Sequence, residues 1–193
     1  MSIYQTRAAE EQLLARFGEV FAAPGEIADN LQDADLLFDP ALDSEGQEHE
    51  VTGSNYILLQ TSTDRTLRKN AFESLYKGYR THINTFAASY SGCVKGAAAE
   101  AAARHYESSR AMSMDGENIP GAVYDNLIAT VRQYLPAMYR YERLRKRLMG
   151  LDELHMYDIY TSLVENAEIQ VDYEEAFNIV KEGLAPLGEQ YAQ

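Results

Sequence analysis

The feature that most restricts the fold of this chain is a run of apolar residues at helical spacing between residues 64 and 97. Residues that recur every three or four positions lie on one face of a helix. The members of the run are Leu67, Ala71, Phe72, Leu75, Tyr76, Tyr79, Ile83, Phe86, Ala87, Tyr90, Val94 and Ala97. No proline lies between Pro40 and Pro120 to interrupt them. The pattern therefore predicts a helix over residues 64–95, about 48 Å long, which is longer than most helices of globular proteins.

Capping and bending residues define the predicted limits of this helix. Ser62 and Asp64 carry side-chain oxygens that can accept hydrogen bonds from the free amides of a helix start. At the other end, we expect a bend at Gly92 or Gly96 that leads into the alanine-rich residues 97–103.

Helical spacing predicts further helices on both sides of this segment. A first helix is expected over residues 7–21 and is expected to end before Pro24, with a short helix within residues 26–36. A second long helix is expected over residues 120–150, where Pro136 should kink or split it.

The last two helix ends are marked by local signals. Gly150 suits the C-terminal cap of the helix before it. Asp172 and Glu175 have the spacing of a capping box at the start of a further helix.

A small β-hairpin is the one departure from helix that the sequence predicts. Apolar residues 36–38 and residues 49–51 flank an acidic, glycine-containing turn at residues 43–46. The predicted fold class is therefore all-α, a long-helix, multi-helical scaffold with one small β-hairpin near residues 36–51.

The chain is expected to divide near residue 52. Residues 1–52 would comprise the first helix and the acidic hairpin, and residues 53–193 the long-helix part. The net charge of −13 is distributed unevenly along the chain. Residues 1–55 carry twelve aspartates and glutamates but only two basic residues, Arg7 and Arg16, which gives a balance of −10.

Composition excludes several classes of partner. A charge of −13 repels phosphate groups, so nucleic acid is not expected as a partner. No apolar run approaches the roughly 20 residues that span a bilayer, so no membrane association is expected. A lone cysteine, Cys93, excludes an internal disulfide framework and fits a reducing compartment. We expect a soluble, cytoplasmic protein.

One cationic cluster stands against this acidic background. Its members are Arg140, Arg143, Arg145, Lys146 and Arg147. We interpret it as a solvated helix end, where cations also suit the helix dipole, and a nucleic-acid face is the less favoured alternative.

Metal-dependent hydrolysis would need two histidines on one helical face with a glutamate between them. The nearest approach begins at His49 and Glu50, but Gly53 stands where the second histidine would be. Asp152 lies three residues before His155, a single carboxylate–histidine pair where a di-iron bundle needs two. We therefore assign no catalytic residue and no metal ligand in this chain, and no cofactor of its own.

Two other kinds of candidate residue have a structural interpretation first. Cys93 is expected to be a small core residue rather than a nucleophile. Tyr76, Tyr79 and Tyr90 are expected to be core or interface residues, with a substrate-lining stripe as the alternative.

Beyond single residues, the order of several short segments is informative. The most specific of them has the spacing D-R-x-x-R-x-x-A-F, which Asp64, Arg65, Arg68, Ala71 and Phe72 provide. Further segments lie at residues 10–14, 34–38, 55–61, 75–79, 84–88, 104–108, 119–128, 141–146, 157–160, 173–176 and 186–191. Their order over residues 10–191 resembles that of the oligoendopeptidase F family of zinc metallopeptidases.

The resemblance implies a mostly helical zinc endopeptidase that cleaves short peptides in an internal channel. It also implies that the HExxH helix and the further glutamate ligand lie beyond the segment present here, so zinc belongs to the complete family enzyme. We therefore expect a fragment that forms a helical wall of the channel and is inactive alone, with a missing catalytic half or self-association as the partner of its apolar faces.

Two other functions stay open from the sequence. A non-catalytic module that binds peptides or a partner protein is suggested by the tyrosine-rich helices. A helical metal carrier would require Asp152, His155 and distant carboxylates to meet in the fold.

Overall fold

The structure is a computed structural model that describes residues 8–164, 171–188 and 191. Its residues form helices and one two-stranded hairpin, as the all-α prediction requires. Contacts divide the chain into two compact units, Met1–Thr161 and Ser162–Gln193. The division predicted near residue 52 stays a prediction.

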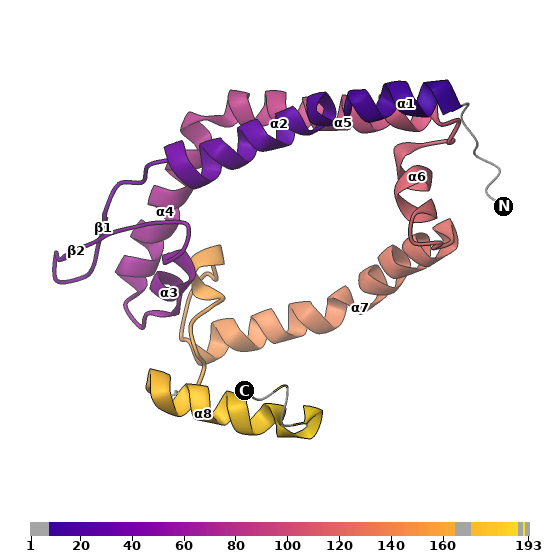
Figure 1. Cartoon of the computed structure of the whole chain (residues 1–193). Coiled ribbons are helices and arrows are strands. Elements are labelled where there is room, and N and C mark those ends of the chain that lie inside the picture. Colours follow the sequence, from indigo (N-terminus) through magenta and orange to yellow (C-terminus); the bar gives the residue numbers. More distant parts are fainter. Residues whose placement is uncertain (1–7, 165–170, 189–190, 192–193) are drawn as a thin grey trace. The chain divides into compact units, whose positions relative to one another are not determined.

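The first unit holds most of the secondary structure (Figure 1). In chain order its elements are α1 (Ala8–Arg16), α2 (Gly18–Asn30), a π-helical turn (Leu31–Asp35), β1 (Ala41–Leu42), β2 (Glu48–His49), α3 (Tyr56–Thr61), α4 (Arg65–Thr81), α5 (Ile83–Ala103), α6 (Ser109–Asp115), α7 (Gly121–Leu148) and a 3-10 turn (Met156–Asp158). The second unit contains α8 (Tyr173–Leu184) and a 3-10 turn (Ala185–Leu187). None of the described helices combines the length and the apolar character that a bilayer span needs.

The long helix predicted over residues 64–95 is two helices, α4 and α5, that meet at His82. The hydroxyl of Thr81 donates a hydrogen bond to the carbonyl of Lys77, four residues earlier. Such back-bonding competes with the helix ladder and bends helices. The second helix, α5, runs without interruption to Ala103, and the bend expected at Gly92 or Gly96 stays a prediction.

The two glycines of α5 lie where α2 packs against this helix. Figure 1 shows α2 running alongside α5, and the two helices pack against each other. A Cβ atom built on Gly92 would lie 2.8 Å from the Cβ and Cγ atoms of Pro24, and one on Gly96 would lie 3.5 Å from the ring of Phe21. The missing side chains let α2 approach closely.

The same contact explains why Pro24 does not end the first helix. The helix expected over residues 7–21 breaks earlier, at Phe17, and Pro24 lies inside α2. A proline within a helix removes one backbone hydrogen bond. Here its ring packs on Gly92, so tertiary packing prevails over the local signal.

The hairpin is present, but it is shorter than predicted and shifted. Ala41 pairs with His49 and Leu42 with Glu48 in an antiparallel register. Residues 36–38, predicted as the first strand, lie outside it, and Phe38 packs instead against α4. A Cβ on Gly78 would lie 2.8 Å from the Phe38 ring.

The core of the first unit lies between the hairpin region and α4. Its buried members are Ala41, Val51, Leu67 and Ala71, with Phe38 and Leu59 packed against them. Polar contacts fix the same junction, because Asn70 Nδ2 donates to the carbonyl of Leu42 at 2.7 Å. A two-stranded ribbon is marginal alone, so its packing on α4 is what stabilises it.

Local capping signals are confirmed at three helix ends. The Asp64 carboxylate accepts from the amide of Thr66 at 2.8 Å, and Asp172 accepts from the amide of Glu175 at 2.9 Å. Gly150 has a positive φ of 64° after α7, as a C-terminal glycine cap requires. Between its ends, α7 continues through Pro136, so Pro136 does not split the helix, and the alternative of a kink stays a prediction.

A substitution in α5 tests the close packing of α2. Gly92→Ala places a methyl group against the Pro24 ring, so we expect a loss of about 1–3 kcal/mol in the free energy of unfolding. Gly25→Ala is the matched control in α2, because nothing lies within 4 Å of its added Cβ. This control should gain about 0.5–1 kcal/mol from helix propensity. Denaturant unfolding measures both changes, and equal gains in the two variants would contradict the packing.

Candidate functional site

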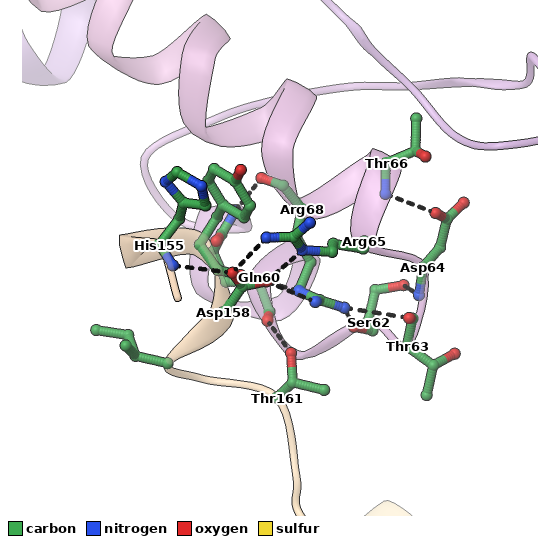
Figure 2. A network of polar contacts seen from close by, with 12 residues as sticks. Gln60, Ser62, Thr63, Asp64, Arg65, Thr66, Arg68, His155, Asp158 and Thr161 are labelled. Atoms are coloured by element: carbon green, nitrogen blue, oxygen red, sulfur yellow. Dashed lines mark hydrogen bonds and ion pairs between the residues drawn. The ribbon is translucent and has the colours of Figure 1, made fainter. Parts of the chain in front are cut away.

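A buried carboxylate, Asp158, is the centre of a network of polar contacts (Figure 2). Arg65 binds it with two hydrogen bonds, from Nε to Oδ1 and from Nη2 to Oδ2, both 3.0 Å long. Arg68 Nη2 donates to Oδ1, also at 3.0 Å, and the backbone amide of His155 donates to Oδ2 at 3.0 Å. Each carboxylate oxygen therefore accepts two hydrogen bonds, and the capacity of the group is filled.

The guanidinium of Arg68 likewise has hydrogen-bond partners for most of its donors. Its Nε donates to the carbonyl of Tyr157 at 2.9 Å. Its Nη1 donates to the carbonyls of Ser62 and Thr63, at 2.8 and 3.1 Å. Arg68 thus pairs with Asp158 and also satisfies three backbone carbonyls around the start of α4.

Helical spacing brings the two arginines together. Residues three apart on a helix lie on the same face, and Arg65 and Arg68 are both in the first turn of α4. Asp64 caps this turn, and the amide of Ser44 donates to its other carboxylate oxygen at 2.6 Å. The Ser44 hydrogen bond is the main cause that lowers the pKa of Asp64 below its ordinary value.

The surroundings of Asp158 determine its charge. Burial alone raises the pKa of this carboxyl group, because it removes water from the charged form. The hydrogen bonds from Arg65, His155 and Arg68 outweigh burial and lower the pKa of Asp158 to about 2. Asp158 is therefore ionised at neutral pH and forms a buried ion pair with Arg68.

The network extends from Asp158 to the end of α7. Arg145, near the C-terminus of α7, donates to the carbonyl of Thr161 from Nη1 at 2.8 Å and to the carbonyl of Ile159 from Nη2 at 2.6 Å. The hydroxyl of Thr161 donates to the carbonyl of Gln60 at 3.4 Å, and Gln60 Nε2 donates to the carbonyl of Arg68 at 2.8 Å. Residues 157–161 are therefore held by α3 and α4 on one side and by α7 on the other.

Two buried atoms of this network have no hydrogen-bond partner among the described residues. They are Oε1 of Gln60 and Nε of Arg145. Arg145 is nevertheless bound by backbone carbonyls and lies near the ring of Tyr141, 6.0 Å from its centroid. Carbonyl dipoles and an aromatic face are both favourable surroundings for a guanidinium.

This geometry holds segments of the chain in place, and it occupies the carboxylate at its centre. A general base or a metal ligand needs an oxygen lone pair that is not already occupied. Both oxygens of Asp158 are occupied by donors of its own chain. We conclude that the network positions α4 and α7 by way of residues 157–161.

The histidine nearest to a zinc motif has a local partner instead. His49 lies in β2, and its Nε2 is 2.9 Å from Oδ2 of Asp43 in the hairpin turn. The His49 hydrogen bond, followed by that from the Gln47 amide, lowers the pKa of Asp43. This pair stabilises the turn.

In the part of the chain that the structure describes, Asp152 and His155, which a helical metal carrier would need to bring together, form no hydrogen bond or ion pair with each other, and His155 has other neighbours. His155 stacks on the ring of Tyr157, with centroids 4.9 Å apart, and its Nε2 lies 3.8 Å from a carboxylate oxygen of Glu153. Among residues 8–164, 171–188 and 191, no group of three or more histidine, cysteine, aspartate or glutamate side chains gathers in a way that could hold a metal ion. The residues described here therefore do not fit a zinc ion, which takes four nitrogen, sulfur or carboxylate ligands.

The core position predicted for Cys93 is wrong, because the side chain is exposed. Its neighbour Gly92 is the residue that faces α2. Successive residues of a helix are about 100° apart, so the contact at Gly92 turns Cys93 toward solvent.

The three candidate tyrosines have different surroundings. Tyr79 packs between Phe38 and Phe86, with ring centroids 6.2 and 5.5 Å away, as a core residue would. Tyr76 contacts Phe72 at 4.5 Å but is partly exposed, and Tyr90 is 73% exposed. They do not form one buried stripe.

The cationic cluster near the end of α7 is solvated except at one position. Arg140, Arg143 and Arg147 are exposed, as predicted, whereas Arg145 is buried. The difference comes from residues 159–161, whose carbonyls cover the one face of α7 that carries Arg145.

The central residues of the network were not predicted as a site. The three-residue spacing of Arg65 and Arg68 was a signal that they share a helix face. Their partner Asp158 lies 90 residues after Arg68, and nothing local in the sequence connects them.

The fold and this network can now be compared with known proteins. The model of peptidase family M3 matches residues 58–187, which include the whole network. This match covers more than half of the chain, and the chain belongs to peptidase family M3.

Relatives within the family confirm the resemblance to oligoendopeptidase F. The chain is 43% identical over 183 residues to oligopeptidase PepF of Bacillus subtilis and 39% identical over 184 residues to group B oligopeptidase PepB of Streptococcus agalactiae, in each case over 95% of this chain. The crystal structure of oligoendopeptidase F from Enterococcus faecium superposes with a TM-score of 0.82 at 38% identity, over 98% of this chain.

The relatives are much longer than this chain. It covers 27% of the Bacillus protein, 30% of the Streptococcus protein and 35% of the Enterococcus structure. The chain thus spans about a third of the length of the proteins that it matches.

Removing Arg68 should cost far more stability than removing an exposed arginine. Arg68→Met leaves a buried carboxylate with one arginine fewer and three carbonyls without their donor, so we expect a loss of about 3–5 kcal/mol in the free energy of unfolding. Arg110→Met is the control, because Arg110 pairs with Asp125 at 2.9 Å on the surface. An exposed pair of this kind contributes about 1 kcal/mol or less. Similar losses in the two variants, measured by denaturant unfolding, would contradict a positioning role for the network.

Acid should weaken the network in a defined pH range. The pKa of Asp158 is about 2 in the folded chain and 3.8 ordinarily, so its contribution is complete above pH 4 and disappears as the pH falls toward 2. The contribution amounts to about 2 kcal/mol. Asp158→Asn cannot titrate, so the stability difference between wild type and variant should shrink between pH 4 and pH 2. A difference that stays constant over this range would show that Asp158 does not carry the charge.

Proposed function

We propose that this chain forms a helical wall of an oligoendopeptidase F-type zinc peptidase and contributes no residue to the bond-breaking step. The observation that carries the proposal is the identity of 36–43% with five oligopeptidases of this kind, over 87–95% of this chain but 27–30% of theirs. The substrates of the complete enzyme are short peptides, and its compartment is the cytoplasm.

The chemistry of the site supports a scaffold role. The most buried charged residues, Arg68 and Asp158, are bound to each other and to the backbone. The described histidines do not converge with other ligands on a metal position. Zinc would therefore be held by the part of the complete enzyme that this chain does not cover, and hydrolysis would depend on that part.

A second candidate is a module that binds a peptide or a partner protein without cutting it. Exposed aromatic side chains favour it, in particular Tyr134 of α7 and Tyr173 of α8, which are 65% and 85% exposed. Aromatic residues are often the anchors of binding surfaces. Saturable binding of short peptides by the chain alone would support this alternative over the scaffold role.

Hydrolysis of a quenched fluorescent oligopeptide tests the proposal. The chain alone should show no cleavage with added zinc. When it is mixed with the complementary 65% of the Enterococcus enzyme, made separately, cleavage should appear and a chelator should abolish it. Chelator-sensitive cleavage by the chain alone would overturn the scaffold role, because a metal site would then lie within it.

A further inference from the structure

One face of α7 is apolar over most of its length and exposed. Its members recur at intervals of four, four, three, four and three residues, which places them on a single helix face. We call them the α7 stripe: Val123, Leu127, Val131, Tyr134, Met138 and Tyr141, each between 53% and 65% exposed.

Within the first unit, no helix or strand of the described residues covers the α7 stripe, and none of them packs along α7. Arg110 of α6 reaches Asp125 near the start of the helix, at 2.9 Å. The next position of the same face after Tyr141 is Arg145, and there residues 159–161 bury the side chain. This face of α7 is therefore covered at Arg145, near the C-terminal end of the helix, and exposed from Val123 to Tyr141.

A bare face of this kind indicates a binding surface. The stripe extends for about 27 Å from Val123 to Tyr141. Contiguous apolar patches on this scale mark sites of protein interaction. Long helices also depend on packing of their apolar face for most of their stability.

We infer that the α7 stripe is the surface on which the remaining part of an oligoendopeptidase F-type chain packs. In the Enterococcus structure the same arrangement of helices belongs to a chain of which it is only 35%. The other 65% of that chain lies outside the match, and chains of that size bury most of the surface that they expose when unfolded. The inference rests on the proposed function and names the contact that would join the two parts.

The side chains of the α7 stripe determine which chemical character the partner surface needs. Its six members carry no charge: four are aliphatic or methionine side chains and two are tyrosines. The matching surface has to be apolar opposite Val131 and Met138, because a carboxylate or ammonium there would lose its water without gaining a partner.

Two other occupants fit the observations less well. A second copy of this chain also carries a charge of −13, so like-charge repulsion opposes self-association. A short peptide needs a concave site with more than one wall, whereas α7 offers one helix face along which no other described helix or strand of the first unit packs.

A charge placed on the stripe tests the inference. Val131→Asp puts a carboxylate at the centre of the stripe, and Ala129→Asp puts the same charge on the opposite side of α7, two residues and about 200° away. Binding of each variant to the complementary 65% of the Enterococcus enzyme is measured by titration calorimetry. We expect Val131→Asp to weaken binding about tenfold or more and Ala129→Asp to change it less than about threefold. Circular dichroism of both variants confirms equal helix content.

The outcomes separate this inference from the proposed function. Binding that is unchanged by Val131→Asp, an absence of any complex with the wild-type chain, or a dimer of the chain alone that only Val131→Asp dissociates would each overturn the stripe as the docking surface. Restored peptide hydrolysis that Val131→Asp leaves unchanged would do the same while supporting the proposed function. A complex that is sensitive to Val131→Asp but never cleaves peptides would support the stripe and overturn the proposed function.

Discussion

The carboxylate of Asp158 has lost its contact with water, and burial on its own opposes its charge. Arg65, Arg68 and the His155 amide supply four hydrogen bonds in place of water, and this exchange keeps the group ionised. The start of α4 and residues 155–158 must therefore stay together, because separating them would leave a charge buried without a partner. Arg145 then connects residues 159–161 to α7, so the position where α7 ends depends on the same carboxylate.

Local signals were sufficient for much of the fold. The caps at Asp64 and Asp172 and the glycine at Gly150 are short-range devices, whose geometry is determined within four or five residues. Long-range packing overrode one local signal. Pro24 was expected to end a helix, yet its ring packs on Gly92 and α2 continues through it.

The polar network around Asp158 could not be predicted from local sequence signals. Arg65 and Arg68 share a helix face, which the spacing alone predicts, but a buried ion pair requires the partner as well. Asp158 lies in a 3-10 turn 90 residues further on, and its sequence surroundings do not distinguish it from an exposed aspartate. The burial of Arg145 could not be predicted from the sequence either. Arg145 lies within a cluster of cationic residues that are otherwise solvated, and it is buried because the carbonyls of residues 159–161 cover it.

A carboxylate whose four acceptor sites are filled by its own chain is suited to holding structure and unsuited to proton transfer or metal binding. The polar network and the α7 stripe are consequently two parts of one arrangement. The network fixes the C-terminal end of α7 through Arg145, and the uncharged face that precedes Arg145 is left for another surface. A helix held firmly at one end presents its free face in a defined position, which lowers the entropy lost when a partner binds. If the α7 stripe is the docking surface that we infer, the buried ion pair also stabilises the orientation in which that surface meets its partner.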